Sequence, residues 1–214
     1  LIKLIRCEFL MKNLIYSLHK RYQNLGSNLN YFDGIASLAL RLYLIPIFWM
    51  AGHNKLQHFN DTVEWFGNSE WGLGLPFPLV MASLAISAEL GGAVLLALGL
   101  ATRLICIPLI ITMLVAIFTV HIQNGWQAIA DPHAPFANMQ VIESAEKLEK
   151  AREILSTYGN YDWLTSSGSF VILNNGVEFA VTYLVMLGAL LVLGGGRYVS
   201  CDYWISRKVI KSKR

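Results

Sequence analysis

A single arginine within a long apolar segment restricts what this chain can fold into more than any other feature of the sequence. Arg41 lies in the middle of residues 33–51, which are otherwise almost entirely apolar, and Lys55 follows this segment closely. A charged side chain near the centre of a bilayer costs about 2.5–3.5 kcal/mol on insertion scales, so it normally faces the interior of a helix bundle and pairs with another group. The chain must therefore provide further membrane spans and a partner for Arg41.

The composition points to the same class of protein. Hydrophobic residues make up 55% of the 214 residues and charged residues only 14%, whereas soluble domains contain about 25% charged residues. This excludes an ordinary soluble domain and predicts an integral membrane protein in contact with the lipid bilayer. The net charge of +3 would suggest nucleic-acid binding in a soluble chain, but the basic residues gather mainly near the two ends. There they act as topology signals, so we expect no nucleic-acid partner.

Four apolar stretches approach the length of about 20 helical residues that a bilayer requires. We therefore expect an all-α fold, an integral membrane four-helix bundle with interfacial or periplasmic helical segments. The predicted spans cover residues 33–51, 79–101, 104–122 and 170–193, and a periplasmic insertion covers residues 123–169.

Two segments flank this four-span domain, which we place at residues 33–204. Residues 1–32 are predicted to be a cytoplasmic or interfacial segment, with an amphipathic helix that turns Leu14, Ile15 and Leu18 toward the membrane. No A-x-A-like site precedes the first span, so we expect no cleavable signal peptide. Residues 1–10 precede the first methionine and enter no argument, and residues 205–214 are predicted to be a basic cytoplasmic tail.

Shorter helices are predicted outside the spans. Residues 53–78 are rich in aromatic side chains, which is typical of the lipid headgroup region. We expect a half-helix there, capped by Asn60 or Asp61. Within the insertion, residues 141–155 place apolar side chains on one side and mixed charges on the other, which predicts a solvated amphipathic helix.

The distribution of charge in the loops predicts the orientation. Lysine and arginine are concentrated in the N-terminal segment, at Arg103 and in the tail, whereas the loop after the first span carries Asp61, Glu64 and Glu70. Cytoplasmic loops of membrane proteins have an excess of basic residues. We therefore expect a multi-pass protein of the bacterial inner membrane with both termini in the cytoplasm.

Polar and ionisable residues recur in or beside all four spans. Counted at about 1.5 Å per residue, Arg41 and Glu89 fall at a similar depth, and we expect them to pair. A second, outer layer comprises His53, Lys55, His121, Asn174, Asn175 and Glu178. The candidate ligand pocket is drawn from both sets and consists of Arg41, Lys55, Glu89, His121, Asn175 and Glu178.

These residues have two interpretations, which the sequence leaves open. In the first, they are neutralised pairs that fix the register of the helices without any chemistry. In the second, they converge on a pocket for a proton, a ligand or a cofactor, which is the default role of ionisable residues within a membrane. In such a pocket the cations would stabilise an anionic group, and the carboxylates would orient them or relay protons.

Metal and thiol chemistry have weaker support. His53, His58 and His121, together with Met50, offer ligand types that suit copper. The separation of five residues between His53 and His58 is not a helical ligand spacing, however, and histidines in the headgroup region are the simpler interpretation. The three cysteines are widely separated and form no C-x-x-C pair, which predicts neither a disulfide nor a thiolate zinc site.

Several short motifs, taken in order, resemble the DoxX family of small bacterial membrane proteins. Arg41 is followed by Gly52-x-x-Lys55-Leu56, and Glu89-x-Gly91-Gly92 leads to an arginine at position 103. A histidine ends the third span and a glutamate lies in the fourth. Gly-Gly-Gly-Arg197-Tyr198 and Asp202-Tyr203 then complete a resemblance that covers residues 36–204. It implies a four-span bundle and a role linked to thiosulfate or quinone oxidation, thiol-redox defence or peptide maturation.

A second similarity concerns the long third loop. Tyr158-Gly-Asn-Tyr-Asp-Trp163 and Leu173-Asn-Asn-Gly-Val-Glu178 are similar to the HvfX subgroup, which is associated with maturation of copper-binding peptides. At the cytoplasmic edge the chain has Ser200-Cys201-Asp202 where related chains usually have Ser-Leu-Asp. This departure lies away from the expected pocket.

The leading functional hypothesis is an accessory membrane protein of redox, copper or thiol homeostasis, whose pocket accepts a quinone headgroup, a thiol or a peptide. Quinone and copper are the candidate cofactors, a redox or maturation protein is the candidate partner, and a homo-oligomer is possible. One alternative is a component for transport or export of a small solute or peptide. Another is a membrane scaffold for a soluble oxidoreductase or maturation enzyme. No nucleophile and base occur at a recognisable spacing, so the sequence does not establish catalysis.

Overall fold

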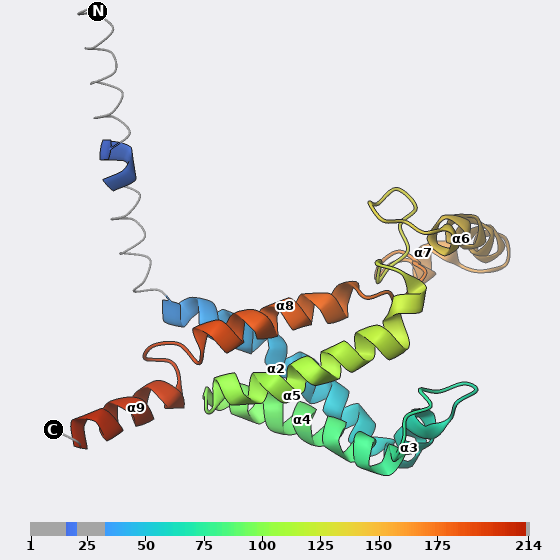
Figure 1. Ribbon diagram of the computed structural model, residues 1–214. Coiled ribbons are helices and arrows are strands. Elements are labelled where there is room, and N and C mark those ends of the chain that lie inside the picture. The colour runs from blue at the N-terminus through green and yellow to red at the C-terminus, as the bar shows by residue number, and fades with distance from the viewer. Residues whose placement is uncertain (1–15, 21–32, 213–214) are drawn as a thin grey trace, which may run out of the picture.

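The computed structural model describes residues 16–20 and 33–212, and all regular elements in this part of the chain are helical. Figure 1 shows them in order along the chain. They are α2 (Asp33–Gln57), α3 (Phe59–Gly67), α4 (Pro78–Leu98), α5 (Thr102–Ala116), the π-helical turn η2 (Ile117–His121), the 3₁₀ turn η3 (Ile122–Asn124), α6 (Met139–Tyr158), α7 (Tyr161–Leu164), α8 (Glu178–Leu193) and α9 (Cys201–Ser212).

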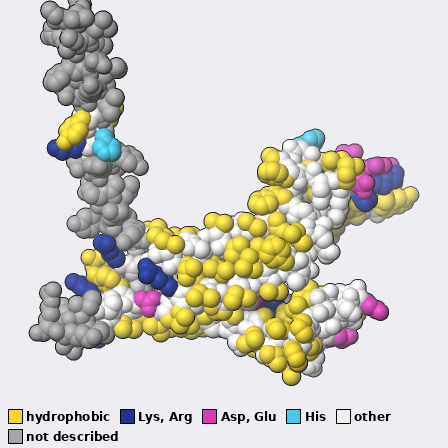
Figure 2. Space-filling view, viewed as in Figure 1, with side chains coloured by type: hydrophobic (Ala, Val, Ile, Leu, Met, Phe, Trp, Pro, Cys, Tyr) yellow, Lys and Arg dark blue, Asp and Glu magenta, His cyan; other side chains and the backbone are white. Residues whose placement is uncertain are grey.

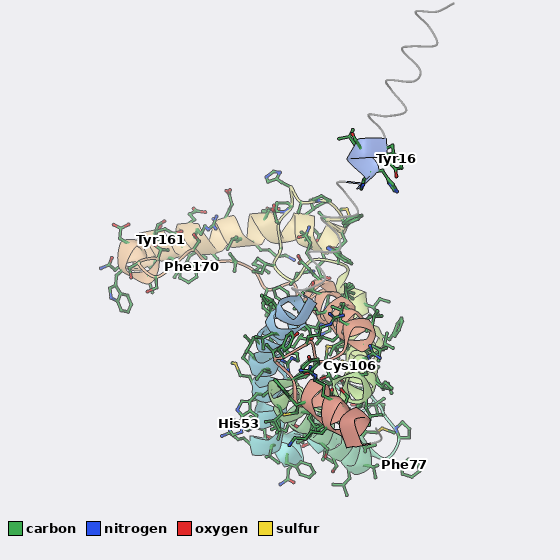
Figure 3. The ribbon with its side chains drawn as sticks, turned by 90° about the vertical axis from the view of Figure 1, so that its left-hand side faces the viewer. Tyr16, His53, Phe77, Cys106, Tyr161 and Phe170 are labelled. Carbon is green, nitrogen blue, oxygen red and sulfur yellow. The ribbon has the colours of Figure 1, made fainter. Side chains whose placement is uncertain are left out.

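Helices α2, α4, α5 and α8 form a four-helix bundle. Helix α2 packs against α4 and α8, and α5 packs against the same two helices. The core between them consists of Leu44, Phe48, Ala93, Leu96, Cys106, Leu109, Leu187 and Leu190, and Figure 3 shows Cys106 inside the bundle. Apolar side chains also cover much of the outer surface (Figure 2). Because a bilayer is an apolar solvent, this confirms the predicted all-α membrane fold.

Three of the helical segments are long and apolar enough to cross a membrane, namely Gly34–Gln57, Pro78–Leu98 and Thr102–Asn124. The fourth, α8, is shorter than predicted, since it begins at Glu178 and not near residue 170. Residues 172–176 are not helical, since Leu173 forms a β-bridge with Ile129 and Asn175 adopts the left-handed conformation with a φ of 58°. Helix α8 has 16 residues, or about 24 Å at 1.5 Å per residue.

The two ends of the bundle differ in charge. At one end, here called the α9 end, α2 and α5 begin and α4 and α8 stop (Figure 1). Figure 2 shows Lys and Arg side chains at this end, whereas most of the visible Asp and Glu side chains lie at the opposite end, on α3 and on α6, which also carries Lys and Arg. Helices α2 and α9, the first and last of residues 33–212, thus share this end.

The shorter helices lie at the end opposite α9. Helix α3 is present as expected, but the predicted cap is wrong. His58 occupies the N-cap position and makes no side-chain capping bond. Because α2 continues to Gln57, α3 begins at Phe59, and Asn60 and Asp61 fall inside its first turn. A negative charge there is favourable next to the positive end of the helix dipole.

Helix α6 contains the predicted amphipathic segment 141–155 and begins at Met139. The preceding residue, Asn138, caps it, since its side chain accepts a hydrogen bond from the backbone N–H of Val141. Together α6 and α7 form what we call the arm, which extends away from the bundle in two perpendicular views (Figures 1 and 3). The predicted N-terminal helix at Leu14 and Ile15 lies outside the described residues, and Leu18 is exposed on a short helical stretch.

Candidate functional site

Arg41 lies at the α9 end of the bundle and is fully buried. Its Nη1 donates a hydrogen bond to the carbonyl of Leu96 at 3.1 Å, and its Nη2 donates to the carbonyl of Val199 at 2.8 Å. The Leu96 carbonyl lies in the last turn of α4 and also accepts the backbone N–H of Gly99 at 3.2 Å, so Arg41 provides a second donor to it. This guanidinium joins the first helix of the bundle to the last turn of α4 and to the segment after α8.

Gly99 makes this position of Arg41 possible. It has a φ of 61°, in the left-handed region that glycine adopts most easily, and it follows the last residue of α4. A Cβ atom at this position would collide with Nη1 of Arg41 and with Ser200. Only glycine therefore fits both the backbone conformation and the close approach of the guanidinium.

The predicted ion pair between Arg41 and Glu89 is wrong. Arg41 hydrogen-bonds at the level of Leu96, which lies seven residues beyond Glu89, or about 10 Å along a helix. The prediction assumed equal depth from position in the sequence, but α2 and α4 pack so that a later residue of α2, Lys55, reaches Glu89. The carboxylate is thus neutralised by the other cation of the candidate pocket.

Lys55 and Glu89 form a close ion pair between α2 and α4. Lys55 Nζ lies 2.8 Å from both carboxylate oxygens of Glu89. The Glu89 side chain is only 5% exposed, whereas the Lys55 side chain is 25% exposed. One partner is therefore enclosed by the bundle, and the other opens to its surroundings. Such an arrangement offers ammonium protons to a ligand while the carboxylate keeps the ammonium oriented.

The surrounding backbone supports this pair. Gly52 lies one helical turn before Lys55, and a Cβ atom there would come within 3.0 Å of the Glu89 Cβ and 2.9 Å of the Leu90 side chain. Small residues at such crossings let two membrane helices approach closely. Beyond Lys55, Thr62 Oγ1 donates a hydrogen bond to the carbonyl of His58 at 2.8 Å, across the first turn of α3.

The other three candidate residues, His121, Asn175 and Glu178, lie together at a junction between the segment after α5 and the segment before α8. His121 Nδ1 lies 2.9 Å from the carbonyl of Asn175, and the Glu178 carboxylate accepts a hydrogen bond from the backbone N–H of Ala128 at 2.9 Å. None of the three has a hydrogen bond to Lys55 or Glu89 within the described residues. The structure therefore divides the six candidates among three places.

Asn174 holds this junction together from the inside. Its side-chain amide is 2.7 Å from the carbonyls of both Asn124 and Gln127, and the residue is buried. Gly176 lies so close to the carbonyls of Gln127 and Gly125 that a Cβ atom would collide with them. The contacts around His121 and Glu178 are thus mostly with backbone groups, as in an architectural junction.

The histidines proposed as weak metal ligands are dispersed. His53 stacks on Trp49 with ring centroids 6.4 Å apart, and His58 Nδ1 lies 3.7 Å from Asp61. Within the described residues, no group of three or more His, Cys, Asp or Glu side chains could hold a metal ion. The donor set for copper does not fit these residues, so we derive no metal chemistry from them.

Asp202 stabilises the start of α5, a role that the sequence did not predict. One of its carboxylate oxygens accepts the backbone N–H of Ala101 at 2.7 Å, and the other accepts that of Thr102 at 2.9 Å. These N–H groups begin α5, so Asp202 caps that helix from about a hundred residues further along the chain. Sequence patterns for helix caps include only residues close to the start of the helix, so they do not predict a cap from Asp202.

Comparison of the sequence with known proteins identifies relatives of this chain. The DoxX family model matches residues 36–122, a range that includes Arg41, Lys55, Glu89 and His121. The chain is 36% identical over 97 residues to the protein named "Putative oxidoreductase CatD" of Bacillus subtilis (strain 168), a match covering 45% of this chain and 68% of that protein.

A second relative is the "Inner membrane protein YphA" of Escherichia coli (strain K12), which is 33% identical over 82 residues, or 36% of this chain and 56% of that protein. No solved structure matches. The match to the family model and the identity to the CatD protein agree with the four-helix architecture. This chain therefore belongs to the DoxX family.

Proposed function

We propose that this protein is an accessory subunit of an oxidoreductase system in the bacterial inner membrane, and that the Lys55–Glu89 pair is its ligand-binding group. The observation that carries the proposal is an ion pair with one buried and one partly exposed member, because ionisable residues within membrane spans usually serve a ligand or proton pathway. The name of the Bacillus subtilis relative supports the oxidoreductase class.

A quinone-like headgroup is the ligand class that suits this pair best. When bound, a quinone supplies two-electron, two-proton redox chemistry inside the membrane. Lys55 would donate a hydrogen bond to a quinone carbonyl through an ammonium proton that Glu89 does not use. Glu89 would hold the ammonium in place and orient its remaining proton toward the quinone carbonyl. The electrons would come from a partner protein of redox metabolism.

The proposed orientation places the α9 end in the cytoplasm, and with it both described ends of the chain. Its support is the concentration of Lys and Arg at this end (Figure 2), because cytoplasmic segments are enriched in basic residues. The arm then lies on the periplasmic side. Its segment Tyr158–Trp163 belongs to the similarity with HvfX proteins, which makes a peptide the alternative ligand.

The proposal is tested by titrating the detergent-purified protein with a decyl-chain benzoquinone and measuring tryptophan quenching. We expect saturable binding that weakens about tenfold or more in Lys55→Gln and in Glu89→Gln, since a hydrogen bond to a charged group contributes about 1.5–3 kcal/mol. Lys150→Gln, on the exposed face of the arm, should bind as the parent protein does. Equal binding by all variants, or no saturable binding, would refute the quinone site.

A second candidate function is a membrane scaffold for a soluble oxidoreductase. The observation that favours it is the arm, which extends from the bundle (Figure 1) and exposes Tyr158 by 87% and Trp163 by 71%. Exposed aromatic residues are frequent anchors of protein interfaces. Under this hypothesis, Trp163→Ala should abolish co-purification of a redox enzyme from native membranes, whereas Glu89→Gln should leave co-purification unchanged.

A further inference from the structure

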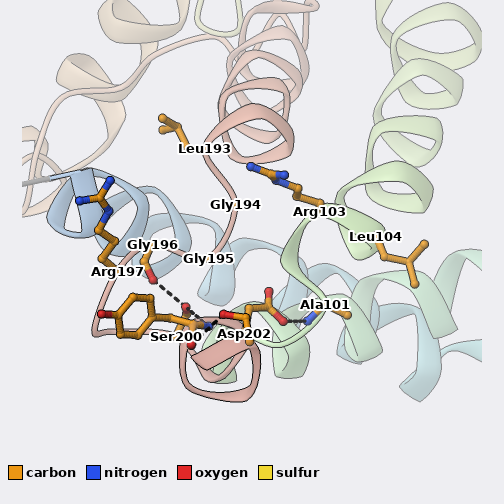
Figure 4. A pocket seen from close by; sticks show the side chains of 12 residues that line it. Ala101, Arg103, Leu104, Leu193, Gly194, Gly195, Gly196, Arg197, Ser200 and Asp202 are labelled. Carbon is orange, nitrogen blue, oxygen red and sulfur yellow. Dashed lines mark hydrogen bonds between the residues drawn. The ribbon is translucent and has the colours of Figure 1, made fainter. Parts of the chain in front are cut away.

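A cavity of about 580 Å³ lies at the α9 end, where α8 stops and α5 begins. Its walls come from the start of α5, the glycine-rich segment after α8 and the first turns of α9 (Figure 4). This place is distant in the chain from the Lys55–Glu89 pair and is independent of the function proposed above. Its position at the end of the bundle places it at the level of lipid headgroups.

Two arginines line this cavity from different elements. Arg103 belongs to α5, and Arg197 follows the glycine run after α8. Figure 4 shows both side chains beside the glycine segment. Arg103 is exposed and donates a hydrogen bond from Nη2 to the carbonyl of Val192 at 2.9 Å. In the part of the chain that the structure describes, no carboxylate lies within 4.0 Å of Arg103, so its charge remains available to an anion.

The carboxylate in the cavity wall does not cancel this charge. Asp202 directs one oxygen to the N–H of Ala101 and the other to the N–H of Thr102. Both oxygens are thus committed to the start of α5. Among the residues that line the cavity, two guanidinium groups thus stand against one carboxylate.

The glycine segment adds neutral donors. Gly195 and Gly196 line the cavity, and the backbone N–H groups of these two residues have no hydrogen-bond acceptor among the described residues. Gly194 and Gly196 have φ values of 77° and 85°. Backbone N–H groups in such turns form concave sites for anions. A Cβ atom at Gly195 would collide with Ser200, so this close approach requires glycine.

One side of the cavity is apolar and faces the membrane. Leu104 is 69% exposed and Leu193 is 46% exposed, and both line the cavity. They continue into the lipid-facing surfaces of α5 and α8. A ligand that combines a phosphate with acyl chains would match the arginines at one end and these leucines at the other.

From these observations we infer that the cavity binds a phosphate group, and that its occupant is the headgroup of an anionic phospholipid. Arg103 and Arg197 pair with the phosphate oxygens, since guanidinium and phosphate match in charge and geometry. The N–H groups of Gly195 and Gly196 complete the donor set. The acyl chains lie along Leu104 and Leu193.

The inference is tested by native mass spectrometry of the full chain in detergent, titrated with equal amounts of dioleoyl phosphatidylglycerol and dioleoyl phosphatidylcholine. We expect the parent protein to retain the anionic lipid preferentially. A hydrogen bond between a guanidinium and a phosphate changes affinity about tenfold, so Arg103→Gln and Arg197→Gln should each lower the preference by about that factor. Lys208→Gln removes a positive charge from α9 outside the cavity wall and should leave the preference unchanged.

A parallel titration with sn-glycerol 3-phosphate distinguishes a membrane lipid from a soluble phosphate. Failure of this compound to displace the retained lipid at millimolar concentration would support the phospholipid. Displacement that disappears in Arg103→Gln would support the phosphate site but overturn the lipid as its occupant. An equal loss of preference in Lys208→Gln would show a diffuse effect of charge and would overturn the site altogether. Circular dichroism of each variant verifies that the helices are intact.

Discussion

Lys55 Nζ lies at the same distance, 2.8 Å, from both carboxylate oxygens of Glu89, across the packed surfaces of α2 and α4. Breaking a fully buried ion pair by removing one partner costs about 3–5 kcal/mol, because it leaves an uncompensated charge. The Lys55 side chain is 25% exposed, so the ammonium retains part of its solvation and the cost here should be smaller. The pair is thus well suited to a double-mutant analysis.

The first prediction concerns this pair. Glu89→Gln and Lys55→Gln should each lower the free energy of unfolding by about 2 kcal/mol, and the double variant should lose at least 1 kcal/mol less than the sum, since residues in contact are coupled. Unfolding is measured by circular dichroism during titration of detergent micelles with SDS.

A matched control is the pair of Lys150 and Glu153, whose charged atoms are 2.7 Å apart while both side chains are more than 60% exposed. Its coupling energy should stay within about 0.5 kcal/mol, as for other exposed ion pairs. Strictly additive losses at Lys55 and Glu89 would contradict the ion pair.

The second prediction concerns Gly99. Gly99→Ala should destabilise the protein by about 2 kcal/mol or more, because alanine is strained in the left-handed region and its Cβ would displace Arg41. Gly91 lies within α4, and a Cβ there meets no atom within 4 Å, so Gly91→Ala is the control. Thermal unfolding of both variants in detergent measures the difference, and similar stabilities would show that the guanidinium does not need this space.

The third prediction concerns the junction before α8. Asn174→Ala removes the hydrogen bonds to the carbonyls of Asn124 and Gln127, at about 0.5–1.5 kcal/mol for each. The cost stays in this range because the Gln127 carbonyl still accepts the N–H of Gly176 and the Asn124 carbonyl still accepts the side-chain amide of Asn138. The loss should be local, so hydrogen exchange should accelerate in residues 124–131 and 172–178 and remain unchanged in α2 and α4. Gln123→Ala removes only an exposed contact of 3.5 Å and should change neither region. Faster exchange throughout the bundle would assign Asn174 to its global stability.

Much of the bundle could be predicted because apolar length is a local property. The predicted second span, residues 79–101, differs from the observed α4 (Pro78–Leu98) by one residue at its start and three at its end. The start of α8 could not be predicted in this way. Residues 170–177 are apolar enough to continue a helix, but Asn174 and Gly176 bind the backbone near Gln127, and a contact between distant segments leaves no periodicity in the sequence.

The candidate site, too, could be predicted only in part. The sequence identifies Arg41, Lys55 and Glu89 as ionisable residues that need partners, because their cost in a membrane depends on residue type alone. The choice of partner depends on how α2 and α4 cross, and equal spacing along the chain predicted Arg41 in place of Lys55. Similarly, Asp202 could be seen near a glycine run, but not its capping of α5.

The hydrogen bond from Arg41 to the carbonyl of Val199 connects residues 158 positions apart in the chain. During synthesis α2 and α4 emerge from the ribosome long before residue 199 does, so the guanidinium has only the Leu96 carbonyl of its two acceptors until the segment after α8 is made. Insertion of the helices and completion of their polar contacts are therefore separated in time. A nascent chain interrupted before Val199 would leave Arg41 without one of its two acceptors, a defect that membrane quality-control proteases could recognise.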